Sequence, residues 1–400
     1  MKNILDGVIG YIKKTDWILW LLVIGVSIYS LLLLNSVSVQ TDANWDSSQF
    51  TAIMLGLAGA VLISLTDYSG VASYWYLIGG FCVFLMIYTL VVADAVVGAD
   101  GVYARAWIKI ANRTFQSSEL VKIGFIVTFA KHLDVVKKKG VINDVLHVIL
   151  LFFHAAVPFL LCHQQGDDGA GLVFLFVFLC MSFAAGVKLR YFVILFALVV
   201  LAIPVLWNTV ISSYQKLRFN AVLNLDDPTV MNNEGYQQSN ARISIGSGQW
   251  SGHGLYNGRR VSSGAVTFQH SDFIFSVAGE ELGFIGSVAI LVLLLLLMLK
   301  TLHIAKNSRD EMGKYMCFGY FGIIAFQSII NIGMCLAVLP VMGVTLPFFS
   351  SGGSSAMCLY LGIGLIQSVF SRRKESDGMH LSRNSPIRLS YNKPLQRFSK

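Results

Sequence analysis

The residues best suited to chemistry lie in one stretch, residues 268–286, which reads FQHSDFIFSVAGEELGFIG. Asp272 stands near His270 where a polar segment meets a very apolar one, and Glu280 and Glu281 follow inside a run long enough to cross a membrane. An acidic side chain at bilayer depth is costly and usually marks a functional site. This stretch is therefore the first candidate.

Asp272 has two interpretations that the sequence leaves open. At the start of a helix an Asp caps the chain by accepting backbone N–H bonds, and the same position is a ready-made site for an anion. If the helix includes residue 272, residues 272, 276 and 280 share one face. Ser276 and Glu280 then extend a polar track inward, while Glu281 points off this face and is expected to bond to a neighbouring helix.

A second pair of charges, Glu119 and Lys122, opens another apolar run within the segment FQSSELVK. Their i, i+3 spacing allows an ion pair on one helix face. One interpretation is a structural pair that reduces the cost of burying both charges. The other is that Lys122 binds an anion or orients an acidic group nearby.

Two further segments could line a site near these charges. In QQGDDGAG, Gln165, Asp167 and Asp168 lie among glycines that favour a tight turn; a polar turn is the simpler interpretation, and a part in the site is the alternative. Residues 340–355 are broken by Pro and Gly. Irregular backbone at membrane depth is tolerated only where it lines a cavity or is buried in protein, so this segment is expected to form a wall of the same site.

A glycine-rich run, residues 245–254, lies in the longest polar segment of the chain. It lacks the GxxxxGK[ST] pattern, which excludes a nucleotide-binding P-loop, and close approach of its backbone to a lipid headgroup is the remaining functional interpretation. Phosphate could also meet the arginines of the same segment, Arg242, Arg259 and Arg260. Its histidines do not have the spacing of a metal site.

The elements that must position these residues are membrane spans. Of the 400 residues 55% are hydrophobic and 13% are charged, whereas about 25% of a soluble domain is charged. The apolar runs are continuous, unlike the alternating strands of a β-barrel, and about 20 residues long, as a spanning helix requires. We predict an all-α polytopic membrane protein with about ten transmembrane helices, near residues 17–39, 51–67, 73–93, 118–134, 145–162, 170–187, 190–210, 273–299, 315–338 and 354–371.

Basic residues in the short loops predict the orientation, because cytoplasmic loops carry an excess of Lys and Arg. With both termini cytoplasmic, one side receives the basic groups at residues 13–14, 131–139, 188–190, 300–314 and 372–374. Membrane topology therefore explains the net charge of +8 better than nucleic-acid binding. Residues 105–113 are also basic but fall on the opposite side. Apolar residues alternate with the basic ones there, which suggests a segment that lies along the interface or dips into the bilayer.

The predicted organisation is one membrane domain, residues 1–371, followed by a basic tail, residues 372–400. An external segment at about residues 208–271 separates the seventh and eighth spans. Long structureless loops are unusual in compact domains, so we expect short helices and turns there. The polar composition of the tail predicts disorder.

These motifs together resemble one family, the SEDS proteins (shape, elongation, division, sporulation), such as RodA and FtsW. FQSSELVK is similar to the family's FQPSELxK, and HSDFIFSVAGEELGFIG to its HTDFIFAVxxEELGxxG. GYQQSNARISIGSGQWSGHGL resembles GYQxxQSxxAIGSGGxxGxGL, and NIGMCLAVLPVMGVTLPFFSSGGSS resembles NIGMxxGxLPVxGxPLPFxSYGGSS. The matches keep their order over about residues 16–370.

The resemblance implies a ten-helix bundle in the bacterial cell membrane, with a large external loop between helices seven and eight. It implies a peptidoglycan glycosyltransferase, most like RodA, that polymerises lipid II with a class B penicillin-binding protein inside an elongation or division complex. A divalent metal, Mg or Mn, is a cofactor by the same resemblance, and no organic cofactor is expected.

The resemblance also assigns the site. It makes Asp272 the essential external aspartate, which we interpret as a general base. The residues expected to contact substrate are Glu119, Lys122, Gln165, Asp167, Tyr236, Gln237, Arg242, His270, Glu280 and Ser354. The chain departs from the family pattern at Gly166, Asp168, Asn240, Thr345 and Ser351, which leaves Asp272 untouched.

Two other classes of function remain as alternatives. A lipid II flippase or other transporter would use Glu119, Glu280 and Glu281 for translocation, but the chain has no convincing inverted repeat of broken helices. A non-catalytic scaffold for a penicillin-binding protein would not need Asp272.

Overall fold

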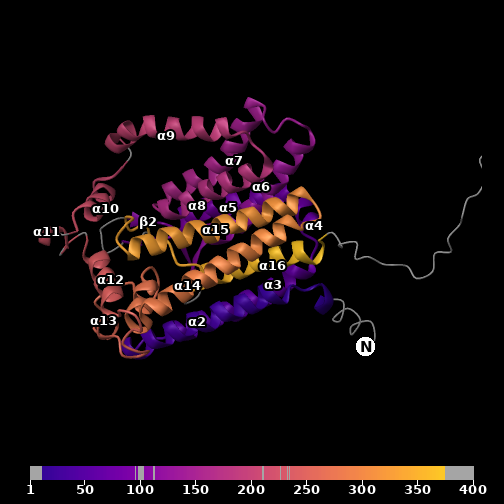
Figure 1. The fold of residues 1–400 in the computed structure, drawn as a ribbon. Helices are drawn as coiled ribbons and strands as arrows, with labels where there is room; N and C mark the ends of the chain where they lie inside the picture. Colours follow the sequence, from indigo (N-terminus) through magenta and orange to yellow (C-terminus); the bar gives the residue numbers. More distant parts are fainter. Residues whose placement is uncertain are drawn as a thin grey trace, which may run out of the picture.

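The computed structural model describes residues 11–94, 96–97, 103–110, 113–209, 211–225, 227–231, 233 and 235–373. Within this part the chain forms a bundle of long helices (Figure 1). They are α2 (Trp17–Thr41), α3 (Trp45–Leu65), α5 (Trp75–Val92), α6 (Ser117–Lys138), α7 (Val145–Gln164), α8 (Asp168–Ala185), α9 (Leu189–Thr209), α14 (Ile274–Lys306), α15 (Glu311–Cys335) and α16 (Gly353–Ser371). The predicted tail from residue 374 onward lies outside the described residues.

The long helices confirm the predicted spans. In the described part, 9 helices are long and apolar enough to cross a membrane. The remaining long helix, α6, matches the predicted span at residues 118–134, and charged residues near both of its ends lower its hydropathy. Its 22 residues give a length of about 33 Å, enough for the hydrocarbon core of a bilayer. The protein is therefore a multi-span membrane protein.

The core of the bundle lies along α15 and α16. Helix α16 packs against α3, and α15 packs against α8 and α14, so that most residues of α15 and α16 are buried. Helix α9 is the opposite case, because none of its residues is buried. Figure 1 shows α9 along the outside of the bundle.

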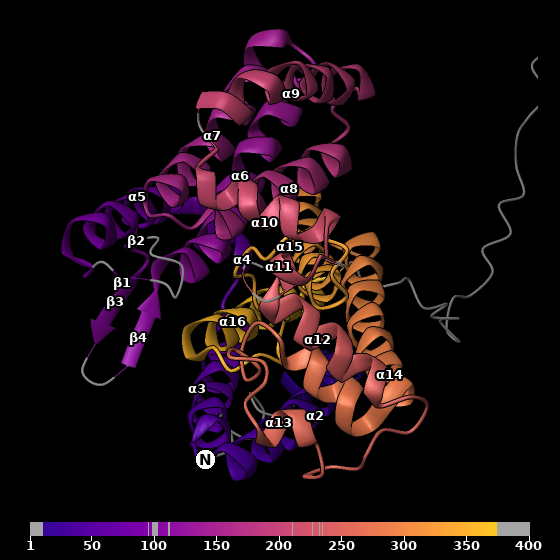
Figure 2. The ribbon, with the colours of Figure 1, turned by 90° about the vertical axis from the view of Figure 1, so that its left-hand side faces the viewer.

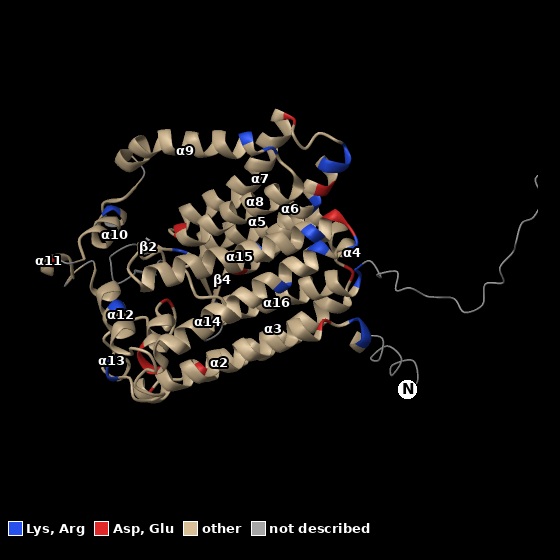
Figure 3. Ribbon diagram, in the orientation of Figure 1, with Lys and Arg blue, Asp and Glu red and all other residues tan. Residues whose placement is uncertain are grey.

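Basic residues gather at the end of the bundle where the described chain begins and ends (Figure 3). Three ion pairs tie helices together there: Lys300–Asp16 at 2.7 Å, Lys137–Glu311 at 3.2 Å and Arg309–Asp67 at 3.6 Å. The short helix α4 (Tyr68–Ser73) lies at the same end. The basic groups that were predicted to share one side therefore do so.

The opposite end carries the short elements (Figures 1 and 2). Between α9 and α14 the chain forms α10 (Ser213–Leu223), α11 (Pro228–Met231), α12 (Tyr236–Ser247) and α13 (Arg259–Ser262). Two small antiparallel hairpins, β1 (Val96–Val97) with β2 (Tyr103–Ala104) and β3 (Trp107–Ile110) with β4 (Arg113–Gln116), precede α6. The segment predicted to follow the interface is thus mostly β-hairpin, with Trp107 opposite Gln116.

Helix α14 is broken at Gly283, whose backbone has φ 65° and ψ −156°. The glycine-rich run enters this break. The carbonyls of Glu280 and Glu281 accept hydrogen bonds from the backbone N–H groups of His253 (3.1 Å) and Gly254 (2.8 Å), and Phe284 and Ile285 donate back to residues 249 and 250. A Cβ on Gly252 would lie 2.1 Å from the Glu281 carbonyl oxygen. These glycines therefore serve close contact with α14, and contact of this run with a headgroup stays a prediction.

Candidate active site

Asp272 lies just before α14 and does not cap it. The N-cap residue is Phe273, and α14 begins at Ile274. The capping interpretation is therefore wrong, and so is the shared helical face of residues 272, 276 and 280. The Ser276 hydroxyl instead donates to the Phe273 carbonyl at 2.7 Å. Because the Asp272 side chain is partly accessible and has no capping function, it is available for chemistry.

The segment between α15 and α16 walls this carboxylate, as predicted. The Asn331 side-chain amide donates to the backbone carbonyls of Asp272 and Val344, both at 2.8 Å. The Ser350 hydroxyl donates to the Ser271 carbonyl at 2.7 Å. A Cβ on Gly343 would lie 4.0 Å from an Asp272 carboxylate oxygen, so the backbone of this segment comes close to the carboxylate itself.

Charge and burial set the protonation of Asp272. Burial raises the pKa of Asp272 to about 6, the Arg218 guanidinium lowers it and the Asp167 carboxylate raises it. Arg218 comes from α10, where it also donates to the Val341 carbonyl at 2.7 Å. A carboxylate whose pKa lies near the working pH is suited to general-base catalysis, because it is ionised and still basic enough to take a proton.

Asp167 connects Asp272 to a second group of charges. Its carboxylate caps α8 through the Ala170 N–H (3.1 Å) and accepts from the Gln116 side-chain amide at 2.5 Å. Burial raises the pKa of Asp167, while these hydrogen bonds lower it; Glu119 also raises it and Lys122 lowers it. The predicted turn therefore lies between the two charged groups that the sequence singled out.

Glu119 and Lys122 form the predicted ion pair, with 2.7 Å between Nζ and Oε2. Both side chains are buried, and no hydrogen bond beyond this pair is recorded for the two atoms among the described residues. A Lys ammonium has three protons to donate, so Lys122 keeps capacity for a further acceptor. The structural and the anion-binding interpretations remain compatible with this geometry.

Three predicted contact residues lie close to this region through backbone contacts or stacking. Gln165 is buried and donates to the Met86 carbonyl at 2.8 Å. The Ser354 hydroxyl accepts from the Gln116 backbone N–H at 3.2 Å. His270 stacks on Trp45 with ring centroids 3.6 Å apart, and burial lowers the pKa of His270 to about 4. At neutral pH this imidazole is uncharged.

The other predicted contact residues lie on α12 and α14. Glu280 accepts from the Arg260 backbone N–H at 2.7 Å, and the Arg260 side chain donates to Ser244 and Asn240. On α12, Tyr236 and Arg242 are exposed and Gln237 is half-buried. Within the described residues, no contact joins this group to the Asp272 side chain.

Glu281 confirms the prediction that it bonds to a neighbouring helix. Its carboxylate accepts from the Ser36 hydroxyl at 2.6 and 2.8 Å and from the Gln40 amide at 2.5 Å, both on α2. The side chain is buried.

Residues that depart from the family pattern have local partners. Asp168 accepts from Gln215 and contacts His163, each at 2.6 Å, and thereby ties α10 to α7 and α8. The Thr345 and Ser355 hydroxyls lie 3.1 Å apart, and the Ser351 N–H donates to the His270 carbonyl. The substituted side chains of Asp168 and Thr345 therefore have polar partners within the fold.

Sequence reasoning missed Arg218, Gln116 and Asn331. Gln116 and Asn331 lie inside the recognised motifs FQSSELVK and NIGMC, yet neither has a side chain that signals chemistry. Arg218 lies outside every motif, and its only signal is a positive charge in the external segment.

No group of three or more His, Cys, Asp or Glu side chains that could hold a metal is found among the described residues. These side chains alone do not fit a divalent metal, and we assign no step to one.

The fold and the site define a class: a multi-span helical membrane protein with a partly accessible carboxylate, Asp272, at the end of the bundle opposite the chain's described ends. The family model described as "Cell cycle protein", which covers FtsW, RodA and SpoVE, matches residues 13–375. The chain belongs to this family, which confirms its resemblance to the SEDS proteins.

Similar proteins cover nearly the whole chain. The peptidoglycan glycosyltransferase MrdB of Escherichia coli K12 is 31% identical over 373 residues, which are 90% of this chain and 97% of the relative. The probable peptidoglycan glycosyltransferase FtsW of Geobacter sulfurreducens is 30% identical over 377 residues, with 91% and 97% covered.

Solved structures agree with this assignment. A chain of the structure "Structural coordination of polymerization and crosslinking by a peptidoglycan synthase complex" has a TM-score of 0.75 at 28% identity and covers 90% of this chain and 99% of its own. The crystal structure of the Thermus thermophilus rod shape determining protein RodA has a TM-score of 0.66 at 28% identity, with 90% and 98% covered.

Proposed function

We propose that this chain polymerises lipid II into glycan strands, with Asp272 as the general base of an inverting glycosyl transfer. The chain is a peptidoglycan glycosyltransferase of cell-wall synthesis, as its curated relatives and the RodA structures support. The observation that carries the catalytic proposal is the Asp272 carboxylate: it is partly accessible, lies within the influence of Arg218, and has a pKa near 6.

In the proposed reaction, the 4-hydroxyl oxygen of an acceptor sugar attacks the anomeric carbon of the donor. The bond between that carbon and the undecaprenyl pyrophosphate breaks, and the pyrophosphate leaves with the bonding electrons. Asp272 takes the hydroxyl proton, which makes the oxygen a better nucleophile. Attack from the face opposite the leaving group inverts the anomeric centre.

Two cations support departure of the pyrophosphate. The Arg218 guanidinium lowers the pKa of Asp272. Its planar group has a geometry suited to phosphate oxygens. Lys122 is buried beside Glu119 and keeps donors for a further acceptor. Positive charge held near the developing negative charge stabilises the transition state.

The site faces the outside of the cell in this proposal. The basic end of the bundle, with both described ends of the chain, is then cytoplasmic by the excess of Lys and Arg. Sugars of the substrate meet Asp272 outside the bilayer, and the polyprenyl tail stays in the lipid. The similar chain from a peptidoglycan synthase complex supports a crosslinking partner, which we propose is a class B penicillin-binding protein of an elongation complex.

The test uses the purified protein in sealed proteoliposomes with fluorescent lipid II. We expect glycan polymer from the wild type and from Asp94→Asn, a matched control that changes an exposed carboxylate paired with Lys109, and no polymer from Asp272→Ala. Polymer undiminished in Asp272→Ala refutes the base assignment. Movement of lipid II across the bilayer without polymer favours a flippase, and neither activity favours a scaffold.

A further inference from the structure

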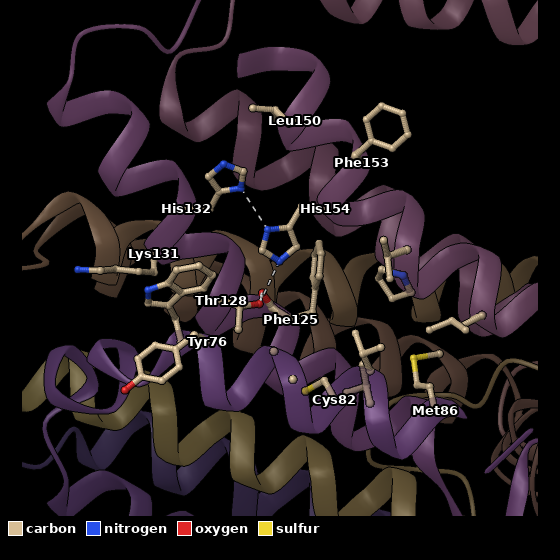
Figure 4. Close-up of a pocket in the computed structure, with 18 of the residues that line it drawn as sticks. Tyr76, Cys82, Met86, Phe125, Thr128, Lys131, His132, Leu150, Phe153 and His154 are labelled. Atoms are coloured by element: carbon tan, nitrogen blue, oxygen red, sulfur yellow. Dashed lines mark hydrogen bonds between the residues drawn. The ribbon is translucent and has the colours of Figure 1, made fainter. Parts of the chain in front are cut away.

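A hollow that Asp272 does not line lies on the side of the bundle formed by α5, α6 and α7. It has a volume of about 710 Å³. Figure 4 shows side chains from these helices around it, with Lys131 and Tyr76 at one end and Met86 at the other. Trp75, Phe153 and Tyr76 are all exposed large apolar side chains. In a membrane protein such a surface faces lipid.

The dimensions of this groove match one leaflet of a bilayer. It follows α5 from Trp75 to Met86, a helical distance of about 17 Å. The hydrocarbon core of a bilayer is about 30 Å thick, so the groove covers about half of it. Since α5 starts next to α4 at the basic end, the half that it covers belongs to the leaflet on that side.

The lining is apolar with one charged exception. The polar side chains in the wall largely satisfy one another: Thr128 contacts the His154 Nε2 atom at 3.2 Å, and the Nδ1 atoms of His132 and His154 lie 3.1 Å apart. Lys131 differs, because no hydrogen bond or ion pair is recorded for its ammonium in the described part of the chain. Its neighbours at the same end, Lys137, Lys138 and Lys300, all have carboxylate partners.

The charge pattern of the groove selects among occupants. Its lining is apolar over most of its length, with one cation, Lys131, at the end on the basic side of the bundle. An acyl chain that carries an anionic headgroup matches this pattern of an apolar stretch ending in one positive charge. The pyrophosphate of the proposed substrate lies at the opposite end of the bundle and does not meet Lys131.

We propose that this groove binds an anionic phospholipid of the leaflet at the basic end. The acyl chain lies along α5, α6 and α7, and the phosphate pairs with the Lys131 ammonium. Aromatic side chains such as Trp75 and Tyr76 favour the level of the headgroups, so they flank this phosphate. This site is distinct from the glycosyl-transfer site, because neither Asp272 nor Arg218, Asp167 or Lys122 lines the groove.

Two variants separate the headgroup from the groove. Lys131→Gln removes the charge and keeps an unbranched polar side chain that is one atom shorter. Gly80→Leu fills the groove, because a Cβ on Gly80 meets no heavy atom within 4 Å and its added side chain extends into open space. Lys188→Gln is the matched control, since Lys188 is an exposed basic residue at the same end that does not line the groove.

The measurement is native mass spectrometry of the delipidated full chain titrated with dioleoyl phosphatidylglycerol or dioleoyl phosphatidylcholine. We expect one retained phosphatidylglycerol, an affinity about fivefold lower in Lys131→Gln, as one basic residue near an anionic lipid accounts for, and no retained lipid in Gly80→Leu. The Lys188→Gln control binds like the wild type. Equal retention of both lipids by the wild type, or unchanged retention in Gly80→Leu, overturns the proposal.

Discussion

Asp272 and Glu281 lie nine residues apart in the chain, and their carboxylates meet opposite surroundings. Glu281 is buried and accepts three hydrogen bonds from α2. Asp272 precedes the helix and stays partly accessible, and burial raises its pKa to about 6. A satisfied carboxylate stabilises the fold, whereas one that is desolvated without full compensation is available to a substrate.

Different backbone contacts hold these two surroundings, and the break in α14 at Gly283 follows both of them in the chain. Hydrogen bonds from the glycine-rich run hold the backbone beside Glu280 and Glu281, while Asn331 holds the backbone at Asp272. One short stretch therefore contains a rigid packing element and a reactive group. The comparison predicts that changes at Asp272 lower activity without lowering stability and that changes at Glu281 lower stability.

The largest effect is expected for Asp272→Asn. Loss of a general base lowers kcat by roughly 10²–10⁴-fold, measured as lipid II polymerisation.

The same variant tests stability. A carboxyl group whose folded pKa (about 6) lies above its ordinary value of 3.8 destabilises the fold when ionised. This penalty is present above pH 6 and disappears as the pH falls below 3.8. Asp272→Asn should thus melt at a temperature equal to or above that of the wild type at pH 7; a large drop in Tm contradicts the comparison.

Lys122→Met should destabilise the protein strongly. It leaves the Glu119 carboxylate buried without its cation, which lowers the free energy of unfolding by about 3–5 kcal/mol. Thermal unfolding in detergent measures this loss. The double variant Lys122→Met with Glu119→Gln should recover most of the stability while polymerisation stays low. Recovery of full activity in the double variant would assign the pair to structure alone.

Glu281→Ala should destabilise without a specific loss of catalysis. The Ser36 and Gln40 donors lose their acceptor, and each buried unsatisfied group costs about 1–3 kcal/mol. We expect a lower Tm and near-normal kcat per folded molecule at low temperature. A kcat reduced as far as in Asp272→Asn would place Glu281 in the chemistry and end the distinction.

The pH dependence of kcat/KM should report the surroundings of Asp272. Activity that needs the ionised carboxylate falls as the pH drops through about 6. Because the Arg218 guanidinium lowers the pKa of Asp272, Arg218→Gln should move this acid limb to higher pH. Initial rates between pH 5 and 8 measure the shift. An unmoved limb in Arg218→Gln would separate Arg218 from the base.

The smallest effect is expected for Asp168→Leu, which restores the residue usual in the family. It removes the contacts to Gln215 and His163, and partly exposed hydrogen bonds of this kind contribute about 1 kcal/mol. Hydrogen exchange of α10 should increase while the exchange of α14 stays unchanged. Unchanged exchange in α10 would show that other contacts hold this helix.

The sequence by itself determined the helices and the local charge pairs. Each span needs a continuous apolar run, and the pairing of Glu119 with Lys122 needs only the three-residue spacing on a helix, so both depend on neighbours in the chain. The resemblance located Asp272 for the same reason, since its motif is contiguous.

Only the tertiary structure decided which distant groups meet. Arg218 reaches Asp272 across 54 positions of the chain, and Asn331 joins the backbones of Asp272 and Val344. The contact between the glycine-rich run and α14 follows from the folded positions of both segments. Such contacts depend on how helices pack, because side chains far apart in sequence carry no local pattern that relates them.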